Sequence, residues 1–203
     1  MNKLHKKSKI AIFGGSFNPP GNHHLLLVRK LTEIFDKTIV VISGTRSHKS
    51  SLETISPKHR GNMAKLAFDK IKVVELDFYD TEHDTFTPTW LLQEKYQQKF
   101  PDSELWFAIG ADLIENGKDG QSEIQTVWQR GTEIWQTLNY AVFDPPSHPL
   151  NHDDLPPQNM VIKIPGLSGR STTIREKRAH NESIDNLVPH AIVEYIKNND
   201  LYT

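Results

Sequence analysis

Residues 10–24 read IAIFGGSFNPPGNHH, and this stretch decides the fold. The apolar run at 10–13 ends at two glycines, and residues 24–35 then space their apolar side chains as a helix does. The predicted order is a buried strand, a glycine turn and a helix. Such a turn brings free backbone N–H groups and the positive end of a helix dipole together, which suits an anionic phosphate. A glycine turn alone is weak evidence, and an ordinary surface turn with two exposed histidines is the alternative.

Five more short runs are apolar throughout, which is typical of strands that are covered on both faces. They lie at residues 39–42, 73–76, 105–109, 140–143 and 161–164. Helical stretches separate them, and two of these stretches open with a capping residue before proline, at Ser56-Pro57 and Thr87-Pro88. Strands that alternate with helices favour a mainly parallel sheet. We therefore expect an α/β protein with a Rossmann-like three-layer fold, which binds ligands at the carboxyl ends of its strands.

The remaining stretches are predicted from their polarity and spacing. Residues 116–125 and 144–159 are polar or rich in proline, so we expect both to be long surface loops. Residues 186–202 are expected to form a helix that closes the chain. A length of 203 residues suits a single domain with a real core.

The composition excludes several classes of protein. Lys and Arg number 24 against 25 Asp and Glu, a formal net charge of -1, so no overall basic field predicts binding to nucleic acid or to an acidic membrane. The absence of cysteine removes disulfides and thiolate metal sites and favours the reducing cytoplasm. No stretch approaches membrane-spanning length, and the basic residues 1–9 are expected to form a solvated tail.

The string GSFNP at residues 15–19, followed by His24, resembles the first signature of the nucleotidyltransferase superfamily. It is most similar to that of the nicotinate/nicotinamide mononucleotide adenylyltransferases, G-[ST]-F-[DN]-P, then H or T, two residues, and H. The usual ending is H-x-G-H, and eukaryotic members carry T-N-M-H, whereas residues 21–24 here read GNHH. Gly21 therefore replaces the first histidine, and His23 is the nearest candidate for the phosphate contact of that histidine.

Residues 170–175 read RSTTIR, which resembles the second signature of the family, S-S-T-x-I-R. In the family this helix start and its arginine hold the β- and γ-phosphates of ATP, a role that suits a planar, permanently charged donor. The resemblance implies one nucleotidyltransferase domain over residues 1–203, in which about 166–203 supply this second signature. A capped surface helix, with Thr173 and Glu176 at capping-box spacing, is the alternative.

The resemblance assigns these two segments to ATP. The implied ATP-binding residues are Gly14, Gly15, Ser16, Phe17, Asn22, His24, Ser171, Thr172 and Arg175. Two of them are implied to be catalytic: His24 stabilises the α-phosphate in the transition state, and Arg175 stabilises the departing pyrophosphate.

The middle of the chain resembles the mononucleotide pocket of the same family. Residues 109–113 read IGADL, and Trp128 stands twelve residues before Tyr140, where the family places a tryptophan that stacks on the pyridine ring. Ordinary core packing is the alternative for Trp128. Further family elements are similar to Thr87 with Trp90, to His48-Lys49 and to His59-Arg60, where Arg60 would pair with carboxylates or the mononucleotide phosphate. The implied mononucleotide-binding residues are Lys49, Thr87, Trp90, Gly110, Asp112 and Trp128.

The implied activity is that of an enzyme of NAD synthesis, which transfers AMP from ATP to nicotinate mononucleotide and releases pyrophosphate. Nicotinamide mononucleotide remains open as a second acceptor. We expect Mg²⁺ to bind mainly through the ATP phosphates, with no metal site made by the protein itself. No nucleic acid or membrane partner is expected, and a homo-oligomer remains open. The alternatives are another adenylyl- or cytidylyltransferase of the superfamily, such as a pantetheine-phosphate adenylyltransferase, and a non-catalytic nucleotide sensor.

Overall fold

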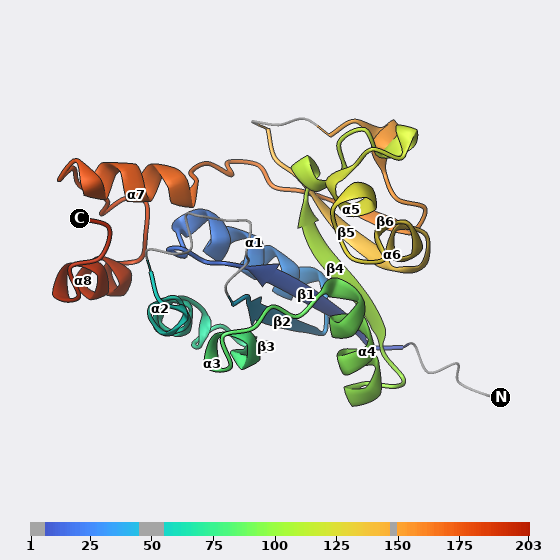
Figure 1. Cartoon of the computed structure of the whole chain (residues 1–203), viewed down its shortest axis with the longest axis horizontal. Coiled ribbons are helices and arrows are strands. Elements are labelled where there is room, and N and C mark those ends of the chain that lie inside the picture. Colours follow the sequence, from blue (N-terminus) through green and yellow to red (C-terminus); the bar gives the residue numbers. More distant parts are fainter. Residues whose placement is uncertain (1–6, 45–54, 147–149) are drawn as a thin grey trace.

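A parallel sheet forms the centre of the computed structural model, which describes residues 7–44, 55–146 and 150–203 (Figure 1). Within these residues the sheet has six strands in the order β3-β2-β1-β4-β5-β6, and every neighbouring pair is parallel. The strands are β1 Lys9–Gly15, β2 Lys37–Ile42, β3 Val74–Asp77, β4 Glu104–Gly110, β5 Asn139–Asp144 and β6 Asn159–Lys163. The predicted strands and the Rossmann-like α/β class are therefore confirmed.

The strand order reverses beside β1, and this reversal determines where a ligand can enter. The chain builds outward from β1 to β3 and then returns to place β4 on the other side of β1. The connections after β1 and β4 therefore leave toward opposite sides, which opens a crevice at the carboxyl ends of these two strands. Parallel sheets bind their ligands at such a crevice.

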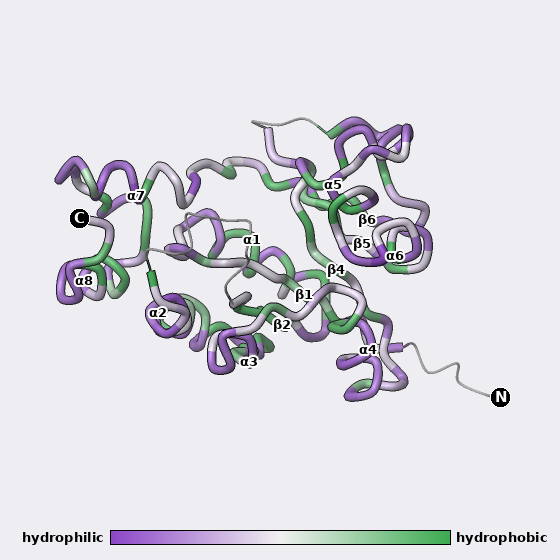
Figure 2. The backbone as a smooth tube through the Cα atoms, in the orientation of Figure 1, coloured by the Kyte–Doolittle hydropathy of each residue, from purple (hydrophilic) through white to green (hydrophobic). Residues whose placement is uncertain are grey.

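Helices cover both faces of the sheet and give the three layers. The helices are α1 Asn22–Ile34, α2 Pro57–Phe68, α3 Tyr79–Glu82, α4 Thr89–Lys99, α5 Glu123–Thr126, α6 Gly131–Thr137, α7 Ser171–Ala179 and α8 His190–Asn198, with 3₁₀ turns η2 Ala111–Ile114, η3 Gly117–Asp119 and η4 His152–Asp154. Figure 2 shows the hydrophobic stretch along β4 and the mostly hydrophilic turns of α7. No described helix combines the length and the apolar character that crossing a bilayer requires.

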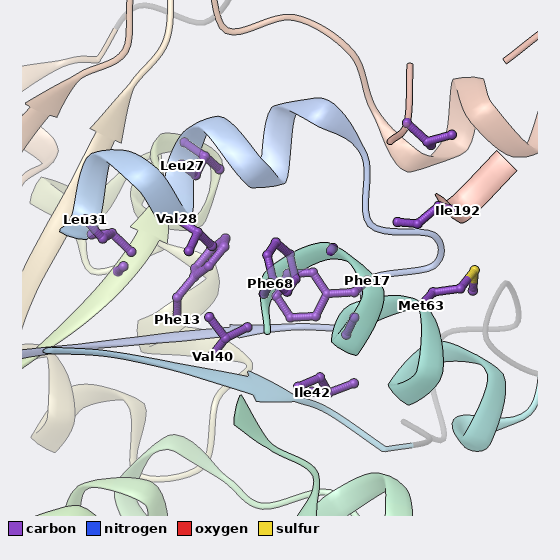
Figure 3. Packing of buried hydrophobic residues seen from close by; sticks show 14 of the residues in the cluster. Phe13, Phe17, Leu27, Val28, Leu31, Val40, Ile42, Met63, Phe68 and Ile192 are labelled. Atoms are coloured by element: carbon purple, nitrogen blue, oxygen red, sulfur yellow. The ribbon is translucent and has the colours of Figure 1, made fainter. Parts of the chain in front are cut away.

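Side chains alternate along β1 and divide the core into two clusters. Ala11 and Phe13 face a cluster that includes residues of α1, α2 and α8, shown around Phe17 and Phe68 in Figure 3. Ile12 faces the second cluster, to which α4, α5 and α6 contribute. The first cluster also holds Ile174 of α7, so the C-terminal part packs directly beside the segment that follows β1.

Two local predictions, one about a helix start and one about a loop, are wrong. Helix α4 begins one residue later than expected, with Pro88 at its N-cap, because the hydroxyl of Thr87 donates to Asp80 instead of capping the helix. Residues 116–125 are not a plain surface loop, since they contain η3 and the start of α5. Ser122 is buried there because its hydroxyl oxygen accepts from the backbone N–H of Gln125 at 3.2 Å, so the polar groups satisfy each other locally.

The C-terminal predictions are correct in kind but wrong in extent. Helix α8 covers only His190–Asn198 of the predicted 186–202, because Pro189 stands at its N-cap. Helix α7 begins at Ser171, two residues before the Thr173 expected to cap it, and its N-cap Arg170 makes no side-chain capping bond. The loop predicted at 144–159 contains the turn η4, and residues 147–149 lie outside the described residues. Of the tail predicted at 1–9, residues 1–6 also lie outside them, and Lys9 belongs to β1.

Candidate functional site

A cavity of about 830 Å³ lies at the carboxyl ends of the central strands, a volume that suits a small-molecule ligand. Its walls come from the ends of β1, β4 and β5, the start of α1, the segment before α4, and residues 167–170 before α7. These segments are far apart in the sequence. The fold therefore gathers, around one cavity, the first segment assigned to ATP, the residues that lead into the second, and the segment assigned to the mononucleotide.

The cavity contains most of the residues that the sequence singles out. The predicted residues among its lining are Gly14, Gly15, Ser16, Phe17, His24, Thr87, Gly110, Asp112 and Trp128. The predicted residues that are described but do not line it are Asn22, Trp90, Ser171, Thr172 and Arg175. Lys49 lies outside the described residues.

The turn after β1 places an open backbone beside a buried aromatic anchor. A Cβ built at Gly14 would meet nothing within 4 Å, so the backbone there is open to a ligand. A Cβ at Gly15 would lie 2.9 Å from the ring of Phe17, which is 1% exposed and sits in the first core cluster. The ring of Phe17 also meets that of His24 edge-on at 5.1 Å. Phe17 therefore acts from the core side and orients His24.

His24 is held as a neutral hydrogen-bond donor. The backbone N–H of Gly21 donates to Nδ1 of His24 at 3.1 Å, which places the proton of a neutral imidazole on Nε2. Burial, with a smaller contribution from His23, holds the pKa of His24 well below its usual 6.5. The ring lines the cavity, so it can donate from Nε2 to a phosphoryl oxygen without carrying a charge.

The second signature is tied to the first through hydrogen bonds between their side chains and backbone. Nη1 of Arg175 donates to the carbonyl oxygen of Asn18 at 2.8 Å, and the hydroxyl of Ser171 donates to the carbonyl oxygen of Pro19 at 2.9 Å. Nη2 of Arg175 also donates to Thr172 Oγ1 at 3.4 Å. In this arrangement Arg175 supports the loop after β1, and Arg170 is the arginine that lines the cavity.

Asn22 and Arg60 also position the loop. Nδ2 of Asn22 donates to the carbonyl oxygen of Asn186 at 3.0 Å, which links the start of α1 to the segment before α8. Arg60 is fully buried, and its Nη1 donates to the carbonyl oxygens of Ser16 at 2.9 Å and Ser43 at 2.5 Å. In the part of the chain that the structure describes, the hydrogen bonds of Arg60 thus go to backbone that borders the cavity, and its expected pairing with carboxylates or a phosphate stays a prediction.

The other end of the cavity carries a carboxylate, from Asp112, and a tryptophan, Trp128. A Cβ at Gly110 would lie 2.3 Å from Oδ1 of Asp112, so glycine there allows this carboxylate to fold over the end of β4. Nε1 of Trp128 donates to Glu123 Oε1 at 3.3 Å, and its ring is partly exposed in the cavity wall. Trp90 instead donates to Gln129 at 3.4 Å.

Asp80 is a site residue that the sequence did not reveal. It is 3% exposed, lines the cavity, and accepts from the hydroxyl of Thr87 at 2.5 Å and from the backbone N–H of Thr87 at 2.9 Å. No local pattern predicts a bond between a residue of α3 and a residue seven positions later in the segment before α4. The sequence did contain a signal for Arg170 as a site residue. An arginine that leads into a predicted helix lies near the N-terminal end of that helix, where anions bind.

The comparisons with known proteins agree with this geometry. The cytidylyltransferase-like family model matches residues 12–177. A nicotinate-nucleotide adenylyltransferase of Bacillus subtilis (strain 168) is 29% identical over 196 residues, which cover 96% of this chain and 98% of that protein. A probable nicotinate-nucleotide adenylyltransferase of Bacillus pumilus is 25% identical, with the same coverage. The structure of Plasmodium falciparum nicotinic acid mononucleotide adenylyltransferase complexed with NaAD has a TM-score of 0.77 at 23% identity, covering 96% of this chain and 97% of that one.

Proposed function

The chain belongs to the cytidylyltransferase-like family, and we propose that it is an enzyme of NAD synthesis that transfers AMP from ATP to nicotinate mononucleotide and releases pyrophosphate. One observation carries the proposal. A single cavity joins a glycine turn and a neutral imidazole donor, at His24, to a carboxylate and a partly exposed tryptophan, at Asp112 and Trp128. The first end suits the phosphates of ATP, and the second suits a ribose and a flat pyridine ring.

The reaction requires positioning and charge stabilisation more than acid–base chemistry. A phosphate oxygen of the mononucleotide forms a bond to the α-phosphorus of ATP, and the bond from that phosphorus to the bridging oxygen breaks. Pyrophosphate leaves with the electron pair, and no proton is transferred. His24 donates from Nε2 to an α-phosphoryl oxygen, where negative charge is stabilised in the transition state.

Residues before and within α7 would bind the leaving pyrophosphate. Arg170 lines the cavity directly, and the first backbone N–H groups of α7 follow it. Arg175 and Ser171 do not line the cavity but hold the loop at Asn18 and Pro19, and Thr172 accepts a hydrogen bond from Arg175. Arg175 reaches the β- and γ-phosphates if its guanidinium releases the carbonyl oxygen of Asn18.

The mononucleotide would occupy the end of the cavity near β4. Trp128 stacks on the pyridine ring, Asp112 accepts from ribose hydroxyls, and Gly110 leaves its backbone accessible to the ligand. The hydroxyl of Thr87 is already committed to Asp80, so Thr87 shapes this end and presents its oxygen as an acceptor. Trp90 lies outside the cavity lining and donates to Gln129.

Mg²⁺ would neutralise the triphosphate charge when it enters with ATP. Among the described residues, no three His, Cys, Asp or Glu side chains lie close enough together to hold a metal ion. The cavity does carry single carboxylates at Asp80, Asp112 and Glu123. This sparse donor set fits an ion that keeps most of its ligands from phosphate and water. We place the reaction in the cytoplasm, a reducing compartment that supplies ATP and suits a chain without cysteine.

Pyrophosphate release with matched substrates tests the proposal. The purified protein is given ATP and Mg²⁺ with nicotinate mononucleotide, nicotinamide mononucleotide or pantetheine phosphate, and CTP replaces ATP in a parallel series. We expect the highest kcat/KM with ATP and nicotinate mononucleotide. A preference for CTP or for pantetheine phosphate would assign the chain to another transferase of the family. Nucleotide binding with no pyrophosphate release from any pair would indicate a sensor.

A further inference from the structure

The ring of His23 lies where a side chain at position 21 would project. A Cβ built at Gly21 would be 2.6 Å from both Cε1 and Nδ1 of His23, and 2.9 Å from Cδ1 of Ile174. Non-bonded carbon atoms normally stay about 3.5 Å or more apart, so a side chain at 21 and the present ring of His23 exclude each other.

Backbone conformation does not explain the glycine at this position. Gly21 has φ -105° and ψ 176°, in the extended region that any residue adopts. Its N–H bond to Nδ1 of His24 would also be available to other residues except proline. The imidazole of His23, together with Cδ1 of Ile174, therefore occupies the space that a side chain at position 21 would need.

The same ring borders the cavity between the two phosphate-binding segments. His23 lines the cavity together with His24, and the two ring centroids are 4.0 Å apart. The same nitrogen, Nδ1 of His23, would be 3.6 Å from a Cβ built at Gly169, the residue before the cavity-lining Arg170. The ring thus lies between the start of α1 and the start of α7.

The ring nitrogens of His23 are available to a ligand. Among the described residues, no hydrogen bond to either nitrogen is present, whereas Nδ1 of the neighbouring His24 is occupied by Gly21. Burial lowers the pKa of His23 to about 4, so the free protein presents a neutral ring that donates from one nitrogen. Arg170, which follows Gly169 in the same cavity lining, carries a permanent positive charge.

We propose that His23 is a second phosphate-binding imidazole of this site, which donates to the β- or γ-phosphate of ATP, and that Gly21 makes room for it. The proposal rests on the proposed function, because it assigns a contact to the same substrate. It gives the two histidines separate tasks: His24 acts on the α-phosphate that is transferred, and His23 acts on the pyrophosphate that leaves, on the side of Arg170.

Substitution by phenylalanine separates binding from packing. His23→Phe keeps a flat ring against His24 and over Gly21 but has no donor, and His180→Phe on the exposed end of α7 is the control. We expect His23→Phe to lower kcat/KM for ATP by at least about tenfold, with an unchanged KM for the mononucleotide and an unchanged melting temperature. Wild-type kcat/KM for ATP in His23→Phe would overturn the proposal.

Moving the imidazole from position 23 to position 21 tests whether the two side chains would occupy the same space. Gly21→His in the wild-type background should impair the protein, because the new side chain meets the ring of His23. Gly21→His combined with His23→Ala should recover at least about fivefold in kcat/KM for ATP over His23→Ala alone, because the imidazole returns to the same space. Equal effects of Gly21→His with and without His23 would overturn the claim that His23 fills this space.

Calorimetric titration with ATP and Mg²⁺ distinguishes failure of this proposal from failure of the proposed function. A wild-type protein that binds ATP but transfers no AMP would overturn the proposed function, and the ATP dissociation constant of His23→Phe would still decide the role of His23. An unchanged constant in that variant would overturn the role, and a constant raised at least about tenfold would support it. A wild-type protein that does not bind ATP would overturn both.

Discussion

The backbone N–H of Gly21 donates to Nδ1 of His24 across 3.1 Å, so the proton of the neutral imidazole resides on Nε2. The bond is short in sequence, only three residues, and it fixes both the tautomer and the direction of the ring. Burial keeps the pKa of His24 well below 6.5, so the ring stays neutral at physiological pH. A donor that is already oriented needs no reorganisation when charge develops on a phosphate.

Replacing His24 should reduce the rate of the chemical step. We expect His24→Ala to lower kcat by about 10²-fold, the scale for removing one preorganised donor, with little change in either KM. His24→Gln should lose less activity than His24→Asn, because the amide nitrogen of glutamine reaches the position of Nε2. The measurement is kcat at saturating substrates, with thermal melting as the folding control. A greater loss of kcat in His23→Ala than in His24→Ala would reverse the roles assigned to the two rings.

Trp128 and Trp90 form a matched pair, because the structure places only Trp128 in the cavity wall. We expect Trp128→Ala to raise the KM for the mononucleotide, with a stacking loss of about 1 to 3 kcal/mol, and to leave ATP binding near normal. Trp90→Ala should leave both KM values close to those of the wild type. Steady-state kinetics with each substrate varied in turn provide the measurement. A lowered melting temperature with unchanged KM in Trp128→Ala would place this residue in the core instead.

Substitutions of Arg170 and Arg175 should differ in their effects on ATP kinetics and on the stability of the loop after β1. Arg170→Ala should raise the KM for ATP without lowering the melting temperature, since Arg170 is exposed and lines the cavity. Arg175→Lys should weaken ATP handling and also loosen the loop at Asn18, because lysine keeps the charge but loses the planar fork. Kinetics and thermal melting of both variants test this distinction. Wild-type kinetics and a wild-type melting temperature in Arg175→Lys would contradict a role of Arg175 in the site.

The bonds between Asp80 and Thr87 should stabilise the mononucleotide end of the cavity. Asp80→Ala leaves the hydroxyl and backbone N–H of Thr87 without their partner, which should cost about 1 to 3 kcal/mol in the free energy of unfolding. We also expect a raised KM for the mononucleotide. Thr81→Ala is the control, because within the described ranges the hydroxyl of Thr81 bonds inside its own turn, to the carbonyl oxygen of Phe78. Urea unfolding and mononucleotide kinetics provide the two measurements, and an equal effect of both variants would contradict a specific role for Asp80.

Buried neutral histidines predict a loss of stability in mild acid. Burial lowers the pKa of His23 from 6.5 to about 4 and holds that of His24 well below 6.5, so the unfolded chain binds more protons than the folded one below pH 6.5. Stability is therefore fully present above pH 6.5 and falls as the pH drops from 6.5 toward 4. Urea midpoints across this range should fall less steeply for His23→Phe than for the wild type. Parallel curves for the two proteins would contradict the pKa direction given for His23.

The fold could be predicted because its signals are local. Each strand is a short apolar run, and the turn GGSFNPPG separates β1 from α1, so the order of elements can be read along the chain. The predictions failed where a side chain had a choice of partner. The hydroxyl of Thr87 was expected to cap α4, but it bonds to Asp80, and Ser122 is buried because Gln125 satisfies it.

The sequence by itself determined the α/β class, the parallel sheet and the ends of the strands at which the site lies, because strand and helix periodicity are properties of neighbouring residues. Only the tertiary structure decided which side chains reach the cavity. It turns Arg175 toward Asn18 and leaves Arg170 in the wall, and it lays the ring of His23 over Gly21. Such contacts depend on the directions in which side chains leave their elements and on the packing of segments that are far apart in the sequence, such as Asn18 and Arg175, which are 157 residues apart. No local pattern encodes them.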